Sequence, residues 1–472
     1  MMAGLRVLAA GQSQPTPDSP SQGQAGNDAG ARAVPAPALT GIVGIEGEDA
    51  AQNAASSLPQ IPSLLGGVGI SSTLLSDMEK SNYLRAGLNV GAVYDDNPLL
   101  LSTGAVSNTS ESIFPNIKID ETTSRMHWTL GYAGGLTINQ KLTSQNEGSH
   151  DVNFDSQFRL SPHVNLRVAE NFSLTTGLFD AGSGDSGVGT GGTNPSLITP
   201  LATQRSNLTT VEINYHFALD DLVGASGSFS DLHFSNPGQA PGTTQPSVLA
   251  NTQTASGSAF WLHRILGRDW GGITYRFDRI TFDPNGESRV HSFLAVDTWN
   301  LSNRYTLTGF VGPQYSESQG VAVGGVQPPQ TTNWSVAGGA EGSWKTAHNS
   351  LSAGFVRSIS NGGGVLGAVR LQNLHANFRR EFMPGWAVGL TASHGTNDSI
   401  TLPPPGSASS VNLTSAGATL ERNVGKSVGI RMGYSHDFQQ QYGLPAPNPT
   451  LNASRNRFFV TLSYQWAKPL GM

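Results

Sequence analysis

Near its C-terminus the chain reads FFVTLSYQW over residues 458–466. Every second residue of this stretch is apolar or aromatic, and most of the residues between are polar. One face would carry Phe458, Val460, Leu462, Tyr464 and Trp466, and the other Phe459, Thr461, Ser463 and Gln465. A period of two residues is the signature of a β-strand with one apolar and one polar face. The stretch therefore predicts a strand that separates an apolar environment from water.

The same alternation recurs along most of the chain. The predicted strands mostly run about 11–16 residues, whereas strands of soluble proteins usually run about 3–10 and a tilted strand that crosses a bilayer needs about 9–11. Their length thus favours membrane-spanning strands. The predicted strands cover residues 83–94, 112–120, 125–138, 150–160, 164–178, 202–217, 222–234, 250–264, 269–281, 288–301, 304–315, 331–345, 350–360, 367–381, 386–396, 409–423, 427–437 and 455–466.

The connections between these strands alternate between short and mostly long. Ser302–Asn303 is a short join, and Asp180–Leu201 is a long one, rich in Gly, Ser and Thr. Short periplasmic turns and longer outside loops are typical of transmembrane barrels. The sequence therefore predicts an all-β fold, a transmembrane antiparallel up-and-down β-barrel of about 18 strands. Sixteen strands remain possible, because the alternation over Ser409–Val424 is blurred.

The composition excludes several other classes of protein. Charged residues make up 13% of the 472 residues, about half the roughly 25% usual in soluble proteins. No segment offers the ~20 consecutive apolar residues of a membrane helix. A net charge of −6 gives no basic footprint for nucleic acid. The absence of Cys excludes disulfides, thiolate metal sites and thiol catalysis.

The chain divides where its aromatic residues begin. Residues 1–82 contain no Phe, Trp or Tyr and are rich in Ala, Gly, Ser and Pro. Such a segment buries too little apolar area to offset its chain entropy. We predict a disordered periplasmic extension over 1–82 with a short helix near 72–80, a barrel over 83–466 and a C-terminal tail over 467–472. We expect residues 1–10, whose apolar core is short, to be a remnant of a signal region.

Aromatic residues gather at strand ends beside the short connections. Amphipathic rings in that position form the interfacial girdle of a transmembrane barrel. Strand-end packing in a soluble β protein is the alternative. The predicted girdle consists of Phe217, Trp270, Trp299, Tyr305, Trp344, Phe382, Trp386 and Trp466.

Three short motifs resemble those of putative outer-membrane β-barrel porins, which are often associated with exopolysaccharide systems. The first is Tyr94-Asp95-Asp96-Asn97 at the end of the first strand, the second is the hairpin Phe158–Leu166, and the third is the closing strand Phe459–Trp466. The resemblance implies an integral barrel in the outer membrane of a Gram-negative bacterium, inserted by the barrel assembly machinery. The implied partners are outer-membrane lipid and small hydrophilic solutes, without nucleic acid.

Three places in the sequence could carry other chemistry. Asp95, Asp96 and Asn97 could offer oxygen ligands to Ca²⁺, but such clusters more often form turns. His394 and His436 raise the possibility of a barrel hydrolase, which needs Ser and His within hydrogen-bond reach. Ser435 and His436, however, are adjacent and would face opposite sides of one strand. Gly362–Gly364 lacks the strand-to-helix context of a phosphate site and predicts a flexible loop. No enzyme, metal or cofactor is expected.

The polar face of the predicted strands carries charges that would line a lumen. We predict a passive porin-like channel whose selectivity depends on these charges, with a modest preference for anions. For each residue the alternative is a salt bridge that rigidifies the wall. The alternative for the whole protein is a non-conducting structural or partner-binding component of polysaccharide export. The candidate lumen residues are Arg85, Asp155, Arg159, Arg167, Glu212, Arg379 and Arg431.

Overall fold

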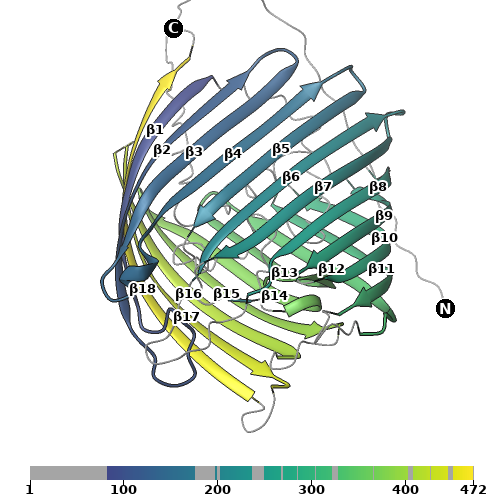
Figure 1. Cartoon of the computed structure of the whole chain (residues 1–472). Coiled ribbons are helices and arrows are strands. Elements are labelled where there is room, and N and C mark those ends of the chain that lie inside the picture. Colours follow the sequence, from purple (N-terminus) through teal and green to yellow (C-terminus); the bar gives the residue numbers. More distant parts are fainter. Residues whose placement is uncertain are drawn as a thin grey trace, which may run out of the picture. The chain divides into compact units, whose positions relative to one another are not determined.

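The computed structural model contains 18 antiparallel β-strands (Figure 1). It describes residues 82–175, 197–198, 202–235, 249–266, 269–283, 285–302, 304–320, 328–364, 366–401, 408–425, 427–444 and 450–470. The strands are β1 (Tyr83–Asp95), β2 (Asn108–Thr122), β3 (Met126–Asn139), β4 (Glu147–Arg159), β5 (Val164–Thr175), β6 (Thr203–His216), β7 (Asp221–Ser235), β8 (Thr252–Leu266), β9 (Asp269–Phe282), β10 (Gly286–Ser302), β11 (Tyr305–Gln319), β12 (Thr331–Lys345), β13 (Asn349–Gly362), β14 (Leu366–Met383), β15 (Trp386–Ser399), β16 (Ser410–Val424), β17 (Val428–Tyr442) and β18 (Thr450–Pro469).

The sheet closes on itself. Each strand pairs with its neighbours in the chain, and β1 pairs with both β2 and β18. The seam between β1 and β18 runs in unbroken register from Tyr83 opposite Pro469 to Asp95 opposite Arg457. A closed sheet has no unpaired strand edge. An open edge would expose backbone N–H and C=O groups to lipid, where they find no hydrogen-bond partner. The predicted 18-stranded barrel is confirmed, and the 16-stranded alternative is wrong.

The two faces of the wall differ as the alternation predicted. On β18, Leu462 is 49% exposed on the outside, whereas Ser463 is 6% exposed on the inside. Large apolar side chains recur on the outer face of many strands, as at Ile113, Ile213 and Val460. A continuous exposed apolar surface of this kind is costly in water and is solvated well by lipid.

Three sequence-based expectations need comment. Strand β18 continues past Trp466 to Pro469, so residues 467–469 belong to the barrel wall and not to a tail. The predicted extension and the short helix near 72–80 lie outside the described residues. In the part of the chain that the structure describes, no helix is long and apolar enough to span a membrane.

Trp270 does not belong to the girdle. It is 1% exposed and packs on the inner face against Leu222, Phe260 and Leu262. The strand β9 begins Asp-Trp-Gly-Gly. Because glycine is neither apolar nor polar in this pattern, the sequence there does not show whether Trp270 faces inward or outward. The register shift between Arg264 and Leu266 lies at this turn as well. The other seven girdle residues lie near the short turns, and Phe217, Trp299, Tyr305, Phe382 and Trp466 are at least 43% exposed.

Glycine allows large inward side chains to lie flat against the wall. A Cβ atom on Gly339 of β12 would lie 2.6 Å from Cε1 of Phe310 on β11 and 2.7 Å from the backbone oxygen of Phe355. A Cβ on Gly224 of β7 would lie 2.2 Å from Cζ of Phe260 on β8. Each ring therefore occupies the space that a neighbouring side chain would need. This close approach explains glycine inside these strands, where it otherwise weakens a sheet.

Candidate pore lumen

Much of the inner face of the barrel is polar, and a buried apolar cluster on β7–β12 consists of Leu222, Phe260, Leu262, Trp270, Leu294, Val296, Phe310 and Ala337. Hydroxyl and amide side chains line the inner face on strands all around the ring, and they are largely buried against one another. Examples are Asn89, Ser112, Thr137, Asn373 and Thr461. Buried polar groups of this kind need hydrogen-bond partners or water. The inner face is thus suited to a wet lumen and not to lipid.

Most of the predicted lumen charges lie near the short-turn end, and several are paired. Arg167 of β5 donates through its guanidinium to Asp155 on the neighbouring strand β4. Glu421 of β16 accepts a hydrogen bond from Nη2 of Arg379 at 3.2 Å, and its other oxygen forms an ion pair with Nε of Arg431 at 3.5 Å. Arg431 lies on the neighbouring strand β17, where a pair of opposite charges stabilises the wall, whereas Arg379 lies on β14, beyond β15. The predicted residues thus form ion pairs on the inner face, and their role in selectivity stays a prediction.

The remaining predicted charges are arranged differently. Glu212 is 1% exposed and accepts from Nδ2 of Asn214 at 2.5 Å. Arg85 lies with its guanidinium 5.9 Å from the ring centroid of Tyr83. Arg159 is the exposed last residue of β4, beside the turn. Of these three, Glu212 belongs to the wall, whereas the two arginines lie at the short-turn mouth.

Three buried ion pairs in the loop half of the lumen were missed from the sequence. Arg455 bonds to Asp95 at 2.7 Å, and Arg457 bonds to Asp437 at 3.2 Å. The third pair joins Arg276 and Asp278 on β9 at 2.8 Å. The available signal was the alternation itself, because Arg455 and Arg457 continue the inward face of Phe459 and Thr461. The partner of Arg455 lies 360 residues away and could not be identified from spacing, whereas Asp437 lies 20 residues before Arg457 and Asp278 two residues after Arg276.

The motif Tyr94–Asn97 fastens the seam of the barrel. Asp95 accepts from Nε of Arg455 at 2.7 Å, and Asp96 accepts from the backbone N and Nδ2 of Asn456 at 2.7 and 2.6 Å. Nδ2 of Asn97 donates to the carbonyl oxygens of Ser454 and Leu101. These carboxylates thus serve the junction of the first and last strands. Among the described residues, no group of three or more His, Asp or Glu side chains could hold a metal ion.

Two described residues between β5 and β6 contact the inner wall formed by β14–β17. The backbone N of Ile198 donates to Oε1 of Gln439 on the inner face of β17 at 3.0 Å. The neighbouring Leu197 packs against Val369 of β14 and Val411 of β16. Strands β14–β17 lie about halfway round the ring from β5 and β6. Residues 197 and 198 therefore lie against the wall opposite these two strands, in the loop half of the barrel.

A second segment also contacts a distant part of the wall. The tip of the β13–β14 hairpin accepts a hydrogen bond at Gly364 O from the backbone N of Ala250, next to β8, at 2.7 Å. Gly364 has φ +84° and lies against the ring of Phe234 on β7. A residue with a side chain would be strained at this positive φ angle, and its Cβ atom would clash with the ring of Phe234. The glycines predicted as a flexible loop thus form a specific contact between distant walls.

The histidines of the hydrolase hypothesis lie on the outer face. His436 bonds to Oδ1 of Asn456 at 2.9 Å, and His394 bonds to Oγ1 of Thr414 at 2.9 Å. Ser435 is buried on the inner face, on the opposite side of β17 from His436. This arrangement does not bring a serine and a histidine together.

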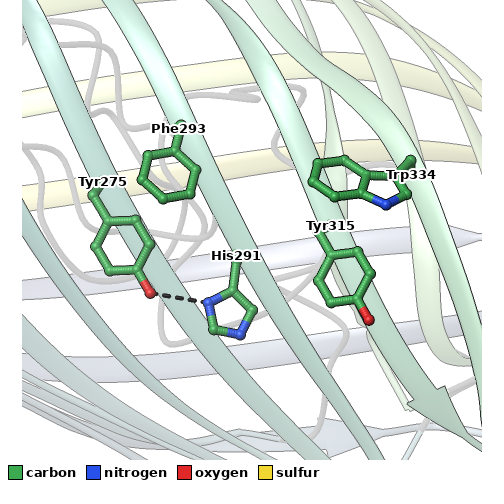
Figure 2. Close-up of a pocket in the computed structure, with 5 residues that line it drawn as sticks. All are labelled: Tyr275, His291, Phe293, Tyr315 and Trp334. Atoms are coloured by element: carbon green, nitrogen blue, oxygen red, sulfur yellow. Dashed lines mark hydrogen bonds between the residues drawn. The ribbon is translucent and has the colours of Figure 1, made fainter.

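A second aromatic cluster, missed from the sequence, lies outside on β9–β12. Figure 2 shows Tyr275, His291, Phe293, Tyr315 and Trp334 around a shallow hollow of about 480 Å³. The hydroxyl of Tyr275 lies 2.9 Å from Nδ1 of His291, and the rings of Tyr315 and Trp334 are 5.0 Å apart. The cluster lies nearer the loop end than the predicted girdle does. Amphipathic rings at both ends of the apolar band are expected of a barrel that spans a bilayer.

Solved structures with a related arrangement come from outer-membrane proteins. The chain is similar to the outer membrane protein opdK of Pseudomonas aeruginosa, with 10% identity, 82% of this chain and 99% of that chain covered, and a TM-score of 0.40. It is similar to OccK2 (OpdF) of the same species in complex with glucuronate, with 10% identity, coverage of 81% and 98%, and a TM-score of 0.42. It is also similar to OccAB1 of Acinetobacter baumannii, with 11% identity, coverage of 82% of this chain and 98% of that chain, and a TM-score of 0.42. No family model and no curated protein matches the chain. The association with exopolysaccharide systems has no support among these comparisons.

Proposed function

We propose that this protein is a bacterial outer-membrane channel for passive diffusion of small hydrophilic solutes. The observation that carries the proposal is the pair of faces on one closed wall: an exposed apolar exterior and a polar, charged interior. Lipid solvates the first, and water and solutes fit the second. No energy source is needed, because solutes would follow their concentration gradient.

Two features of the lumen support selective passage. The group of Arg379, Glu421 and Arg431 faces the passage near the short turns. We expect Ile198 and Gly364, which contact distant strands, to narrow it near the loops. A narrow polar passage with fixed charges discriminates solutes by size and charge.

The orientation follows from the position of the short turns. In outer-membrane barrels these turns face the periplasm, and the start of β1 and the end of β18 lie together at that end (Figure 1). We place residues 1–82 in the periplasm on this ground. The aromatic-ended β18 would be the segment that the barrel assembly machinery reads.

Single-channel recording tests the proposal directly. The purified full-length protein, added to a planar lipid bilayer in KCl, should produce discrete conductance steps, and its gel mobility should change on heating. Protein boiled before addition is the control. A folded, inserted barrel without conductance would reject the channel, and recovery as a soluble protein without detergent would reject the membrane location as well.

A further inference from the structure

The outer face of β6 changes character halfway along the strand. From the short-turn end its first residues are apolar and 43–49% exposed, and the following ones are polar. The apolar part is Phe217, Tyr215, Ile213 and Val211, and the polar part is Thr209, Asn207 and Arg205. On β18 the corresponding outer row stays apolar through Trp466, Tyr464, Leu462, Val460 and Phe458. The outer row of β6 therefore turns polar halfway along the strand, whereas that of β18 does not.

A carboxylate faces the same direction in the middle of β5. Glu170 lies directly opposite Thr209, next to the pair Val168 and Val211. Its Oε2 accepts a hydrogen bond from Oγ1 of Thr209 at 2.5 Å. It is the seventh residue of β5, counted from Val164 at the turn end, so it lies within the ~9–11 residues that cross the hydrocarbon. An ionisable side chain at such a depth is costly and usually marks a functional contact.

The polar residues continue to the loop rim with both signs of charge. Arg205 Nη2 lies 3.3 Å from Oδ2 of Asp231 on β7, and Gln253 of β8 donates to Oδ1 of the same carboxylate at 3.1 Å. We call Glu170, Thr209, Asn207, Arg205 and Asp231 the polar stripe. A surface that carries both signs at neighbouring depths can be complementary to itself.

Beside the polar stripe lies an exterior area without large side chains. Strand β7 presents Ala225 and Gly227 there, and β8 presents Ala255, Gly257 and Ala259, paired as Ala225 with Ala259 and Gly227 with Gly257. A Cβ atom on Gly257 would meet nothing within 4 Å, and one on Gly227 would meet its nearest atom at 3.8 Å. Phe229 and Trp261, 45% and 42% exposed, stand at its two ends. We call these five small residues the small patch.

Small residues and polar groups have the same use inside a membrane. Small residues let two backbones approach closely, and polar side chains find hydrogen bonds that lipid tails cannot give. Two copies of one barrel inserted in one membrane have the same orientation, so residues of equal depth meet. A symmetric contact of this kind needs a self-complementary surface. We propose that the polar stripe and the small patch form a self-association face, occupied by a second copy of this chain.

The test compares the mass of single particles in lipid nanodiscs for the full-length protein and three variants. The parent should contain two or more copies. Gly257→Leu, at a position where an added Cβ atom meets nothing within 4 Å, and Glu170→Val should each raise the single-copy fraction at least fivefold while the heat-dependent gel shift persists. Ala418→Leu places a leucine on the outer face of β16, on the far side of the ring, and should leave the assembly intact.

Cross-linking in native membranes gives an independent measurement. Because the chain has no Cys, a single Gly257→Cys should give an intermolecular disulfide under mild oxidation, and Ala418→Cys should not. A parent that is a single copy in nanodiscs, or an assembly that survives both Gly257→Leu and Glu170→Val, would overturn the inference. If the parent is a single copy that keeps bound lipid, and Glu170→Val loses this lipid, the face binds lipid headgroups and not a second copy. The inference rests on membrane insertion and not on conduction, so a single-copy protein that conducts leaves the proposed function intact.

Discussion

At the scale of single residues, the phase of each strand decides what a substitution costs. Leu462 is half-exposed toward lipid near the middle of the β18 outer row, and Gln465 of the same strand faces inward. We expect Leu462→Arg to destabilise the barrel by about 2–4 kcal/mol, the cost of arginine near the bilayer midplane. Gln465→Arg should cost much less. Refolding into lipid vesicles measures both, and equal losses would mean that the strand does not divide lipid from lumen.

The glycines beneath inward rings make a second residue-scale prediction. Gly339→Ala forces its methyl group into the ring of Phe310 and the backbone of β13, and should cost about 1–3 kcal/mol as overpacking does. Gly309→Ala on the outer face has its nearest atom at 3.7 Å and should change stability by less than about 0.5 kcal/mol. Urea unfolding of both variants in detergent measures the two changes in stability. Equal changes would mean that the conformational effect of replacing glycine, and not the clash with Phe310, determines the cost.

At the scale of elements, the seam between β1 and β18 depends on one buried ion pair. Asp95 and Arg455 have side chains 1% and 2% exposed. Asp95→Ala leaves a buried arginine without its counter-charge and should cost about 3–5 kcal/mol. The double variant Asp95→Leu with Arg455→Met should cost less than Asp95→Ala alone. Arg279→Gln, which breaks an exposed pair with Glu287, should cost about 0–1 kcal/mol. Similar losses in Asp95→Ala and Arg279→Gln would show that closure does not need this pair.

The contact between Ile198 and Gln439 joins a residue of the β5–β6 connection to the inner face of β17, and we expect it to affect the width of the lumen. Gln439→Ala removes the acceptor of the Ile198 backbone N while leaving the outer face of β17 unchanged. We expect a larger mean conductance with more fluctuation between levels. Gln465→Ala, near the short-turn end of the lumen wall, is the matched control and should conduct like the parent. An unchanged current in Gln439→Ala would mean that this contact does not limit the passage.

At the scale of the whole molecule, the lumen charges act together. Because Glu421 lies between Arg379 and Arg431, we expect only a weak ion preference in the parent. Arg431→Gln should shift the reversal potential under a KCl gradient toward cation preference, since a surplus of negative charge raises the local cation concentration. The shift should fade at 1 M salt, where the Debye length is about 3 Å. Arg279→Gln on the outer face should have no effect. A shift in the opposite direction, or none, would mean that the loops set selectivity.

The sequence alone determined the strands, most of their faces and the barrel, and it left the number of strands open between 16 and 18. Each of these depends on local pattern: a period of two assigns the faces, and alternating connection lengths order the strands. Where the pattern failed, as at the Trp270-Gly271-Gly272 start of β9, the face was assigned wrongly, because glycine carries no sign of inside or outside. Charges such as Arg167 and Arg431 near the short turns were likewise predicted from their inward phase, whereas the three buried ion pairs of the loop half were missed.

Only the tertiary structure decided which of these residues meet. The partners Asp95 and Arg455 lie 360 residues apart, and they come together because closing the ring places the last strand beside the first. The pairing of Glu421 with Arg431, the contacts of Ile198 and Gly364 with distant strands, and the meeting of Glu170 with Thr209 likewise depend on register and curvature. Period and spacing describe one strand at a time, whereas salt bridges and such contacts join strands that are distant in the chain.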